Sequence, residues 1–307
     1  MRIRILGSAA GGGVPQWNCR CVNCEAVRAG SPDVLPRTQS SVAVSADGCA
    51  WLLLNASPDI RQQILAYPEL APPDAASRGT AVAGCVLTDA ELDHTTGLLL
   101  MREGCTFGIA STPLVRRWLN RYLPIERLLG HFAERPWTEL ALDEQVELPL
   151  PDGRVSGLRI RAFELGPHVP KFVPENSALV TGSVVGLDIE DVNSGGKLVY
   201  APGVESLDGP LASAARDADC VLMDGTFWDD EEPIRTDISD RTATQMGHVP
   251  VSGPDGSLRW LAELPVRHRT YLHINNTNPM LRQSGPEHSL VNKHGVRVGA
   301  DGDVFEL

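Results

Sequence analysis

Short apolar runs rich in Val, Ile and Leu recur along the whole chain of 307 residues, with helical patterns between them, and this alternation limits the fold most. Such runs predict strands at residues 3–6, 41–45, 51–54, 83–87, 106–110, 155–165, 197–201, 218–223 and 270–274. Helices are expected at residues 58–66, 113–122, 211–216, 242–246, 258–264 and 279–283. No repeat or low-complexity linker divides the chain, since the Pro- and Ala-rich stretch 71–79 is expected to be a surface loop. The sequence therefore predicts one α/β or α+β domain of layered sheets spanning residues 1–307.

The charge of the chain excludes two classes of partner. The net charge is −12 and the isoelectric point is about 5.1, whereas nucleic acids and anionic lipid surfaces are bound by clustered Lys and Arg. Apolar stretches fall far short of the ~20 residues that a membrane-spanning helix needs. The amino terminus indicates a strand and a glycine-rich turn rather than a signal peptide, which predicts a cytoplasmic protein. Thiols stay reduced there, so the seven cysteines suggest metal ligands and core residues rather than disulfides.

Three of these cysteines, Cys19, Cys21 and Cys24, form a C-x-C-x-x-C run in the loop after the glycine-rich turn. Three thiolates so close together can hold one soft, tetrahedral ion at roughly 2.3 Å, with a fourth ligand from elsewhere. The alternative is three unrelated loop cysteines, but cysteine favours burial and seldom gathers on a polar loop. We therefore expect a structural zinc, because catalysis needs an open coordination position. The remaining cysteines lie in or beside apolar strands and are expected in the core: Cys49, Cys85, Cys105 and Cys220.

A second cluster follows the strand expected at residues 83–87. The loop after it carries Asp89, Glu91, Asp93 and His94. Three carboxylates beside an imidazole are electrostatically costly at a strand end unless a cation lies among them. The cluster therefore indicates either a metal site or, as the alternative, a solvated acidic turn.

Two distant strands favour the metal site. One apolar strand ends at Asp224 and another ends around His273. Three strand ends that each present a potential ligand predict a metal cleft at the carboxyl edge of a sheet. Two imidazoles and one carboxylate with vacant positions suit non-haem Fe(II). His94, His273 and Asp93 can supply that set, with Asp224 as a fourth ligand or as a group behind the ligands.

The order of these elements resembles that of the metallo-β-lactamase superfamily, and the resemblance implies a four-layer αββα sandwich. The loop of that superfamily reads H-x-H-x-D-H, whereas Asp89 and Glu91 stand here in place of its first two histidines. The first metal position of the superfamily depends on those two histidines, so this chain lacks two of its ligands. The second metal position survives, and its residues would be Asp93, His94, Asp224 and His273. The resemblance therefore implies one functional metal rather than two.

Five stretches resemble more closely one family of this superfamily, the B proteins of pyrroloquinoline quinone (PQQ) biosynthesis. They are ILGSAAGGGVPQWNCRCVNC, LTDAELDHTTGLLLMREG, VLMDGTFW, MGHVPVSG and LHINNTNPML, in the order of the family. The resemblance implies O2-dependent hydroxylation of the tyrosine ring in the cross-linked Glu–Tyr precursor of PQQ, with catalytic Fe2+ and structural Zn2+. It is also compatible with a homodimer. Two alternatives stay open: a carrier that binds PQQ or its precursor without catalysis, and a metal-dependent hydrolase like the related phosphodiesterases.

The roles of several further residues stay open at this stage. His248 resembles a substrate-side histidine of related phosphodiesterases, which implies acid–base catalysis or, alternatively, a structural hydrogen bond. Asp89 and Glu91 join it as candidate catalytic residues. His273 is alternatively the fourth zinc ligand, because the position of the zinc histidine in related phosphodiesterases holds Asn276 here. A quinone with three carboxylates would require basic residues in the cleft, and the candidates are Arg61, Arg102, Lys171 and Arg241.

Overall fold

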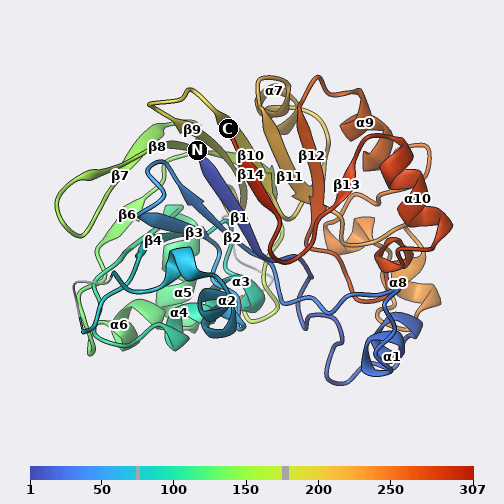
Figure 1. The fold of residues 1–307 in the computed structure, drawn as a ribbon, viewed down its shortest axis with the longest axis horizontal. Helices are drawn as coiled ribbons and strands as arrows, with labels where there is room; N and C mark the ends of the chain where they lie inside the picture. The colour runs from blue at the N-terminus through green and yellow to red at the C-terminus, as the bar shows by residue number, and fades with distance from the viewer. Residues whose placement is uncertain (74–76, 175–179) are drawn as a thin grey trace.

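Two β-sheets packed face to face form the centre of the computed structural model, which describes residues 1–73, 77–174 and 180–307 (Figure 1). In the described part of the chain each sheet has seven strands. The first sheet has the order β14 (Val304–Glu306), β1 (Arg2–Gly7), β2 (Ser41–Ser45), β3 (Trp51–Leu54), β4 (Val82–Val86), β5 (Gly108–Ser111) and β6 (Trp137–Glu139). The second has the order β13 (Arg297–Val298), β12 (His268–Leu272), β11 (Cys220–Asp224), β10 (Lys197–Ala201), β9 (Val184–Asp191), β8 (Val155–Gly166) and β7 (Gln145–Pro149). Residues 74–76 of the loop expected at 71–79 lie outside the described residues.

Each sheet combines parallel and antiparallel strand pairs. The pairs from β3 to β6 are parallel, and so are those from β10 to β13. The other pairs are antiparallel. Parallel strands need crossover connections, which here place helices on the outer faces of both sheets.

Four central strands, β2, β3, β4 and β11, are buried on both faces, which explains their nearly continuous apolar sequences. Side chains alternate along a strand, so Val42 and Val44 of β2 face the second sheet while Ala43 between them faces the helices. In β11, Leu222 likewise points between the sheets and Val221 points toward the outer helices. The alternation fixes the strand register, because a slip by one residue would reverse every side chain.

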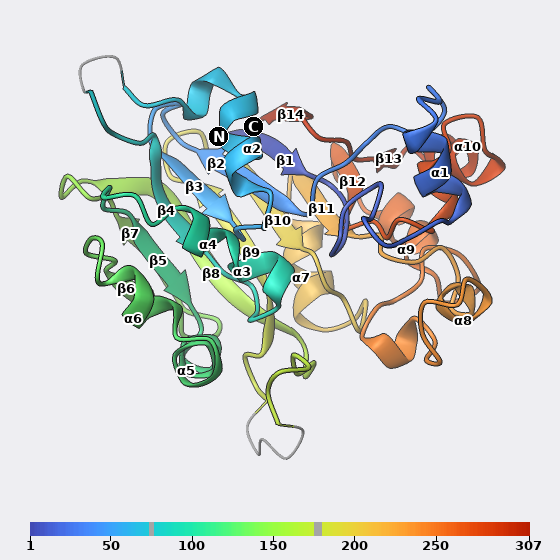
Figure 2. The same ribbon diagram turned by 90° about the horizontal axis from the view of Figure 1, so that it is seen from below.

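Helices cover the outer face of each sheet (Figures 1 and 2). Those over the first sheet are α2 (Ile60–Ala66), α4 (Gly97–Leu100), α5 (Pro113–Tyr122) and α6 (Ile125–Leu129). Those over the second sheet are α7 (Pro210–Arg216), α9 (Ser257–Glu263) and α10 (Pro286–Lys293). In α5, the Thr112 hydroxyl accepts a hydrogen bond from Val115 N at 3.2 Å and Trp118 is buried against the sheet. The layers confirm the expected αββα sandwich.

Every strand and helix expected from the sequence is present, although some ends and types differ. Strand ends shift by no more than two residues. The helix expected at 58–66 begins at Ile60, because the Ser57 hydroxyl accepts a hydrogen bond from Asp59 N at 3.2 Å and holds a turn before it. The helices expected at 242–246 and 279–283 are short 3-10 turns, η2 (Thr244–Met246) and η3 (Pro279–Leu281). The sequence missed β6, β7, β9, β13, β14, α4, α6, α10, α1 (Val22–Arg28), α3 (Leu92–Thr95), α8 (Glu232–Arg235) and the turn η1 (Pro68–Leu70).

Two cysteines expected in the core lie elsewhere. Cys85 and Cys220 are buried as expected, but Cys49 is exposed and Cys105 is half-buried. Cys49 belongs to the turn between β2 and β3, where its backbone N–H donates to Asp47 Oδ1 at 2.8 Å. Cys105 precedes β5, which begins at Gly108 rather than at the expected residue 106.

None of the helices in the described ranges has both the length and the apolar character needed to cross a bilayer.

Candidate metal centre

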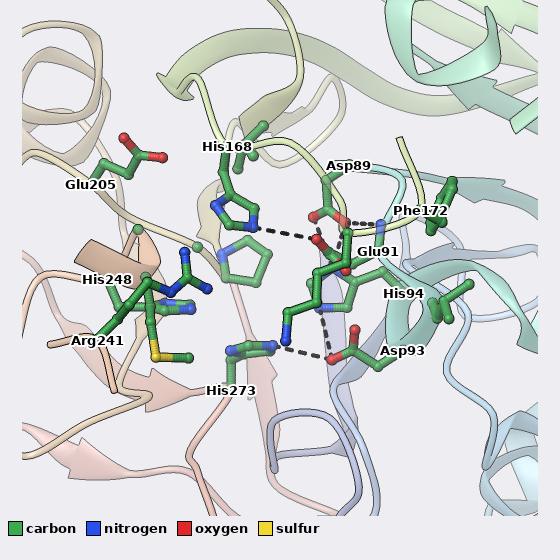
Figure 3. Close-up of a pocket in the computed structure, with 17 residues that line it drawn as sticks. Asp89, Glu91, Asp93, His94, His168, Phe172, Glu205, Arg241, His248 and His273 are labelled. Atoms are coloured by element: carbon green, nitrogen blue, oxygen red, sulfur yellow. Dashed lines mark hydrogen bonds and ion pairs between the residues drawn. The ribbon is translucent and has the colours of Figure 1, made fainter. Parts of the chain in front are cut away.

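Two strand ends bring Asp93, His94 and His273 together at one edge of the sandwich (Figure 3). Asp93 and His94 lie on α3, in the segment that follows β4, and His273 directly follows β12. Asp93 Oδ2 lies 3.4 Å from His273 Nε2 and 3.9 Å from His94 Nε2. One ligand atom of each residue lies within 4.8 Å of the others, a spacing that allows the three side chains to hold one ion.

The buried imidazole of His94 is held from behind by Asp89. His94 Nδ1 lies 2.7 and 2.9 Å from the two carboxylate oxygens of Asp89. These oxygens also accept hydrogen bonds from the Thr88 hydroxyl at 2.7 Å and from Glu91 N at 2.9 Å. Burial opposes a charge on the ring, but the carboxylates of Asp89 and Asp93 outweigh it and raise the pKa of His94 to about 10. The contact with Asp89 also fixes the orientation of the ring, with Nδ1 donating to Asp89 and Nε2 directed toward Asp93.

The environment of His94 Nε2 is the strongest indication that a cation binds at this site. This nitrogen is buried and has no hydrogen-bond partner in the described part of the chain, a situation that costs about 1–3 kcal/mol for a polar atom. Burial opposes ionisation of Asp93, yet the imidazoles of His94 and His273 hold the pKa of Asp93 well below its usual range. A divalent ion among these three side chains would satisfy both the nitrogen and the carboxylate. The residues present therefore fit a metal.

His273 presents its ring from a left-handed backbone conformation, with a φ of 53°. Residues other than glycine seldom adopt this conformation, and those that do are enriched at functional sites. The Thr226 hydroxyl donates to Asp224 Oδ1 at 2.6 Å, and its oxygen lies 2.8 Å from His273 Nδ1. With the hydroxyl proton assigned to the shorter contact, Nδ1 of His273 is the donor to Thr226. This contact holds the ring so that His273 Nε2 faces Asp93 Oδ2 at 3.4 Å.

Asp224, expected as a metal ligand or as a group behind the ligands, lies behind His248. Its Oδ2 accepts from His248 Nδ1 at 2.6 Å and from Val204 N at 3.0 Å, and its Oδ1 accepts from Thr226 N at 2.9 Å. Although Asp224, His248 and His273 form a second close group, both oxygens are engaged within the protein, which favours the outer position. Burial opposes a charge on His248, but Asp224 outweighs it and raises the pKa of His248. The bond to Nδ1 leaves His248 Nε2 available as a proton donor or acceptor.

A cavity of about 510 Å³ opens onto these groups. Glu91 and His168 both line the cavity, and Glu91 Oε1 lies 3.4 Å from His168 Nε2. Of the two acids expected as catalytic, Glu91 has a side chain that is 33% exposed, whereas Asp89 is 3% exposed and bonded to His94. Glu91 is therefore better placed to meet a ligand, and Asp89 is placed to orient His94.

The glycine-rich turn near the amino terminus packs against the metal centre. A Cβ atom on Gly11 would lie 3.1 Å from Asp93 Oδ2, closer than ordinary van der Waals contact. Gly12 and Gly13 follow with φ values of 95° and 70°, in the region that favours glycine. This turn thus forms part of the wall beside Asp93, which explains why it contains glycine.

The three cysteines of the amino-terminal loop gather around Asn276. Asn276 Nδ2 lies 3.0, 3.3 and 3.4 Å from the Sγ atoms of Cys19, Cys21 and Cys24. Burial and the neighbouring thiols raise the pKa of Cys24 to about 12. A cation bound among the thiolates would relieve this opposition to ionisation, so the cysteines fit a zinc ion with the Asn276 amide over the fourth side.

The segment after β12 connects the two centres. Figures 1 and 2 show α1, which begins directly after Cys21, on the same side of the molecule as α8 and α10. Asn23 Nδ2 donates to the carbonyls of Asn276 and Asn278, each at 3.0 Å. His273 groups with Asp93 and His94, while the cysteine group contains no histidine among the described residues. The geometry therefore favours His273 as a residue of the metal cleft over its alternative role as the fourth zinc ligand.

Two residues of the site were not predicted from the sequence. Thr226 orients both Asp224 and His273, and its signal was a hydroxyl residue two positions after a strand-end acid, in Asp224-Gly225-Thr226. Glu205 lines the cavity, and no local sequence pattern pointed to it.

Comparison with known proteins places the chain in a family. Residues 50–274 match the model of the beta-lactamase superfamily domain. The coenzyme PQQ synthesis protein B of Ectopseudomonas mendocina is 44% identical over 305 residues, 98% of each chain. The protein of that name from Pseudomonas aeruginosa strain PAO1 is 44% identical over 311 residues, with 100% of both chains covered.

Solved structures agree with this placement. The zinc-bound PqqB from Methylobacterium extorquens is 38% identical, with a TM-score of 0.91 and 100% of both chains covered. A diphosphatase of the PhnP family is 18% identical, with a TM-score of 0.66 over 100% of this chain and 97% of that chain, and shows the shared fold. From the site geometry, the family model and the full-length relatives together, the chain belongs to the coenzyme PQQ synthesis protein B family of the metallo-β-lactamase superfamily.

Proposed function

We propose that this chain catalyses an iron- and oxygen-dependent hydroxylation in PQQ biosynthesis, acting on the tyrosine ring of the cross-linked Glu–Tyr precursor. The observation that supports this best is the convergence of two imidazole nitrogens and one carboxylate beside the cavity, with His94 Nε2 buried and otherwise unpartnered among the described residues. The names of the relatives supply the pathway.

Asp93, His94 and His273 would hold the iron. Two histidines and one carboxylate with vacant positions are the ligand set of non-haem Fe(II) oxygenases. Fe(II) bound there would supply the redox chemistry by which O2 is activated. One oxygen atom would enter the ring as a hydroxyl group and the other would leave as water, so the reaction would also consume two protons and two electrons from an external reductant.

His248 is the residue that we propose for proton transfer. Its Nδ1 is fixed by Asp224 at 2.6 Å, so its Nε2 can accept a proton from the phenol or from the ring carbon that is hydroxylated. Its ring stacks on that of His273 at 5.8 Å between centroids, which places it next to the proposed ligands. Glu91 and His168 would contact the substrate from the same cavity.

We further propose a structural zinc at Cys19, Cys21 and Cys24. The relative from Methylobacterium extorquens is zinc-bound, and the three thiols lie around one buried amide in this chain. The zinc would fix the segment that carries both Asn276 and His273. It would therefore stabilise the metal cleft without taking part in the reaction.

A second candidate function is a carrier that binds PQQ or its precursor without catalysis. The cavity of about 510 Å³ and its basic lining residues favour it, because they suit a large anionic ligand. A hydrolase has less support, since Asp89, in place of the first histidine of the superfamily loop, directs its carboxylate at His94.

The first experiment measures metal content by element on anaerobically purified protein, before and after reconstitution with Fe(II). The same samples are tested for oxygen uptake and hydroxylated product with the cross-linked Glu–Tyr substrate. We expect one tightly bound zinc, one exchangeable iron, and uptake only when iron is present. One zinc without iron uptake or turnover would favour the carrier, and two zinc equivalents with phosphodiester turnover would favour the hydrolase.

A pair of variants connects this activity to the proposed ligands. His94→Ala should lose iron binding and hydroxylation while it keeps the zinc and the folded circular dichroism spectrum. His131→Ala is the matched control, because His131 is exposed and lies outside the cavity lining. Full hydroxylation by His94→Ala would contradict the proposal.

A further inference from the structure

Two basic side chains line the cavity without a carboxylate partner in the described part of the chain. They are Arg241 and Lys171. Within residues 1–73, 77–174 and 180–307, the Arg241 guanidinium has one weak contact, from Nη1 to the Gln245 carbonyl at 3.5 Å. Of the four basic residues that the sequence offered for an anionic ligand, these two line the cavity, whereas Arg61 lines a different pocket and Arg102 lies 3.8 Å from Glu103.

The acidic groups of the cavity do not neutralise these cations. Asp89 is paired with His94 at 2.7 Å, and Glu91 lies 3.4 Å from His168. Burial raises the pKa of Glu205 and so disfavours its charged form. Asp93 faces the two imidazoles, where a divalent ion would add further positive charge. These carboxylates face other groups, which leaves Arg241 and Lys171 available to bind an anionic ligand.

The rest of the lining indicates the shape of that ligand. Its apolar members are Leu92, Phe172, Val184, Pro202 and Met246. In Figure 3 the Arg241 side chain points into the cavity on the side of His248, across from Glu91 and Asp93. A planar guanidinium can bind both oxygens of a carboxylate at once, while apolar walls favour a flat, weakly hydrated body.

We propose that Arg241, assisted by Lys171, is a carboxylate-recognition subsite for an aromatic polycarboxylic acid. Arg241 binds a carboxylate at one end of the ligand, and the aromatic ring lies between the apolar walls and faces Asp93, His94 and His273. The identity of the substrate rests on the proposed function, but binding of an aromatic polycarboxylate does not require turnover.

The test uses equilibrium binding of PQQ, which has three carboxylates on a planar ring system, and of its trimethyl ester. Both are titrated into the metal-loaded full-length protein under anaerobic conditions, with quenching of tryptophan fluorescence as the signal. Arg241→Gln should weaken PQQ binding about tenfold or more, because a charge-assisted pair of hydrogen bonds is lost. The affinity for the ester should stay the same. Arg241→Lys should recover part of the PQQ affinity, and Lys171→Gln should produce a smaller loss than Arg241→Gln.

Arg102→Gln is the control for a general loss of positive charge and should bind PQQ like the unmodified protein. An unchanged PQQ affinity in Arg241→Gln would overturn the proposal, and so would an equal loss for PQQ and for the ester. PQQ binding that is lost when the metal is removed but is kept in Arg241→Gln would also overturn it, because the metal would then hold the carboxylate.

Steady-state kinetics separate this proposal from the proposed function. If the chain hydroxylates the precursor, Arg241→Gln should raise KM while kcat changes little. If no hydroxylation is found but Arg241→Gln still weakens PQQ binding, the subsite stands and the function becomes that of a carrier. Hydroxylation with an unchanged KM in Arg241→Gln would retain the enzyme and refute the subsite.

Discussion

Glu232 is a buried carboxyl group whose protonation should control how the stability of this protein changes with pH. The residue is 1% exposed. Its Oε1 accepts a hydrogen bond from the Thr277 hydroxyl at 2.6 Å, and its Oε2 accepts one from Trp228 N at 2.5 Å. Burial raises the pKa of Glu232 from 4.5 to about 7. The group thus connects the segment before α8 to the segment that carries His273 and Asn276.

The direction of the effect follows from where the proton is held. Between pH 4.5 and about 7, folded Glu232 keeps a proton that it has lost in the unfolded chain. The free energy of unfolding must therefore fall as the pH rises through this window, and this contribution is constant above it. A tenfold difference in proton affinity is about 1.4 kcal/mol, so the change amounts to roughly 3 kcal/mol.

Glu232→Gln isolates this contribution, because glutamine has the shape of the protonated acid. Its amide oxygen can accept from Trp228 N, and its amide nitrogen can donate to the Thr277 hydroxyl. The variant's free energy of unfolding should match that of the unmodified protein near pH 5. At pH 8 it should be higher by up to roughly 3 kcal/mol. Urea unfolding of both proteins at a series of pH values measures the difference directly.

Glu231→Gln is the control, because Glu231 is the exposed neighbour and the change removes the same charge. Its effect on stability should not depend on pH between 5 and 8. A constant difference between Glu232→Gln and the unmodified protein over this range would refute the reasoning. A variant less stable than the unmodified protein at pH 8 would refute it too.

Two further predictions concern the metal sites. Asp89→Ala removes the acceptor behind His94 Nδ1 and should weaken metal binding at the cleft about 10- to 100-fold, measured by chelator competition; unchanged affinity would show that Asp89 does not orient this ligand. Cys24→Ser should remove the zinc at the cysteines and lower the Tm, measured by elemental analysis and thermal unfolding. Cys49→Ser should change neither, since Cys49 is exposed, and zinc retained by Cys24→Ser would exclude the cysteine site.

The strands that form the core were predictable because their sequences are almost entirely apolar. β2, β3, β4 and β11 are buried on both faces, so each reads as a continuous hydrophobic run. β9 was not predicted because Gly186, Asp188 and Glu190 alternate with its apolar residues, so it forms no continuous apolar run of the kind used to locate the other strands. Asp188 pairs with Arg161 of β8 at 2.7 Å, a contact between strands that local sequence cannot reveal.

The candidate metal cleft was predictable to the extent that each proposed ligand follows a strand. Asp93, His94 and His273 were located in this way, since strand ends at one edge of a sandwich lie close together. Which acids contact the metal and which orient a histidine could not be read from the sequence, because the choice depends on hydrogen bonds between distant segments. Asp224 illustrates this, since its partners Val204 and His248 come from two different loops.

The left-handed corner at His273 limits how the ligand set can change in evolution. Asn, Asp and His are the non-glycine residues that occupy this backbone region most readily, whereas other side chains cost roughly 1–2 kcal/mol there. Two members of this small set, His and Asp, are also good metal ligands. A single substitution at residue 273 can therefore exchange a nitrogen donor for an oxygen donor while the turn stays intact. The metal preference of the site can thus change during evolution while the backbone conformation is kept.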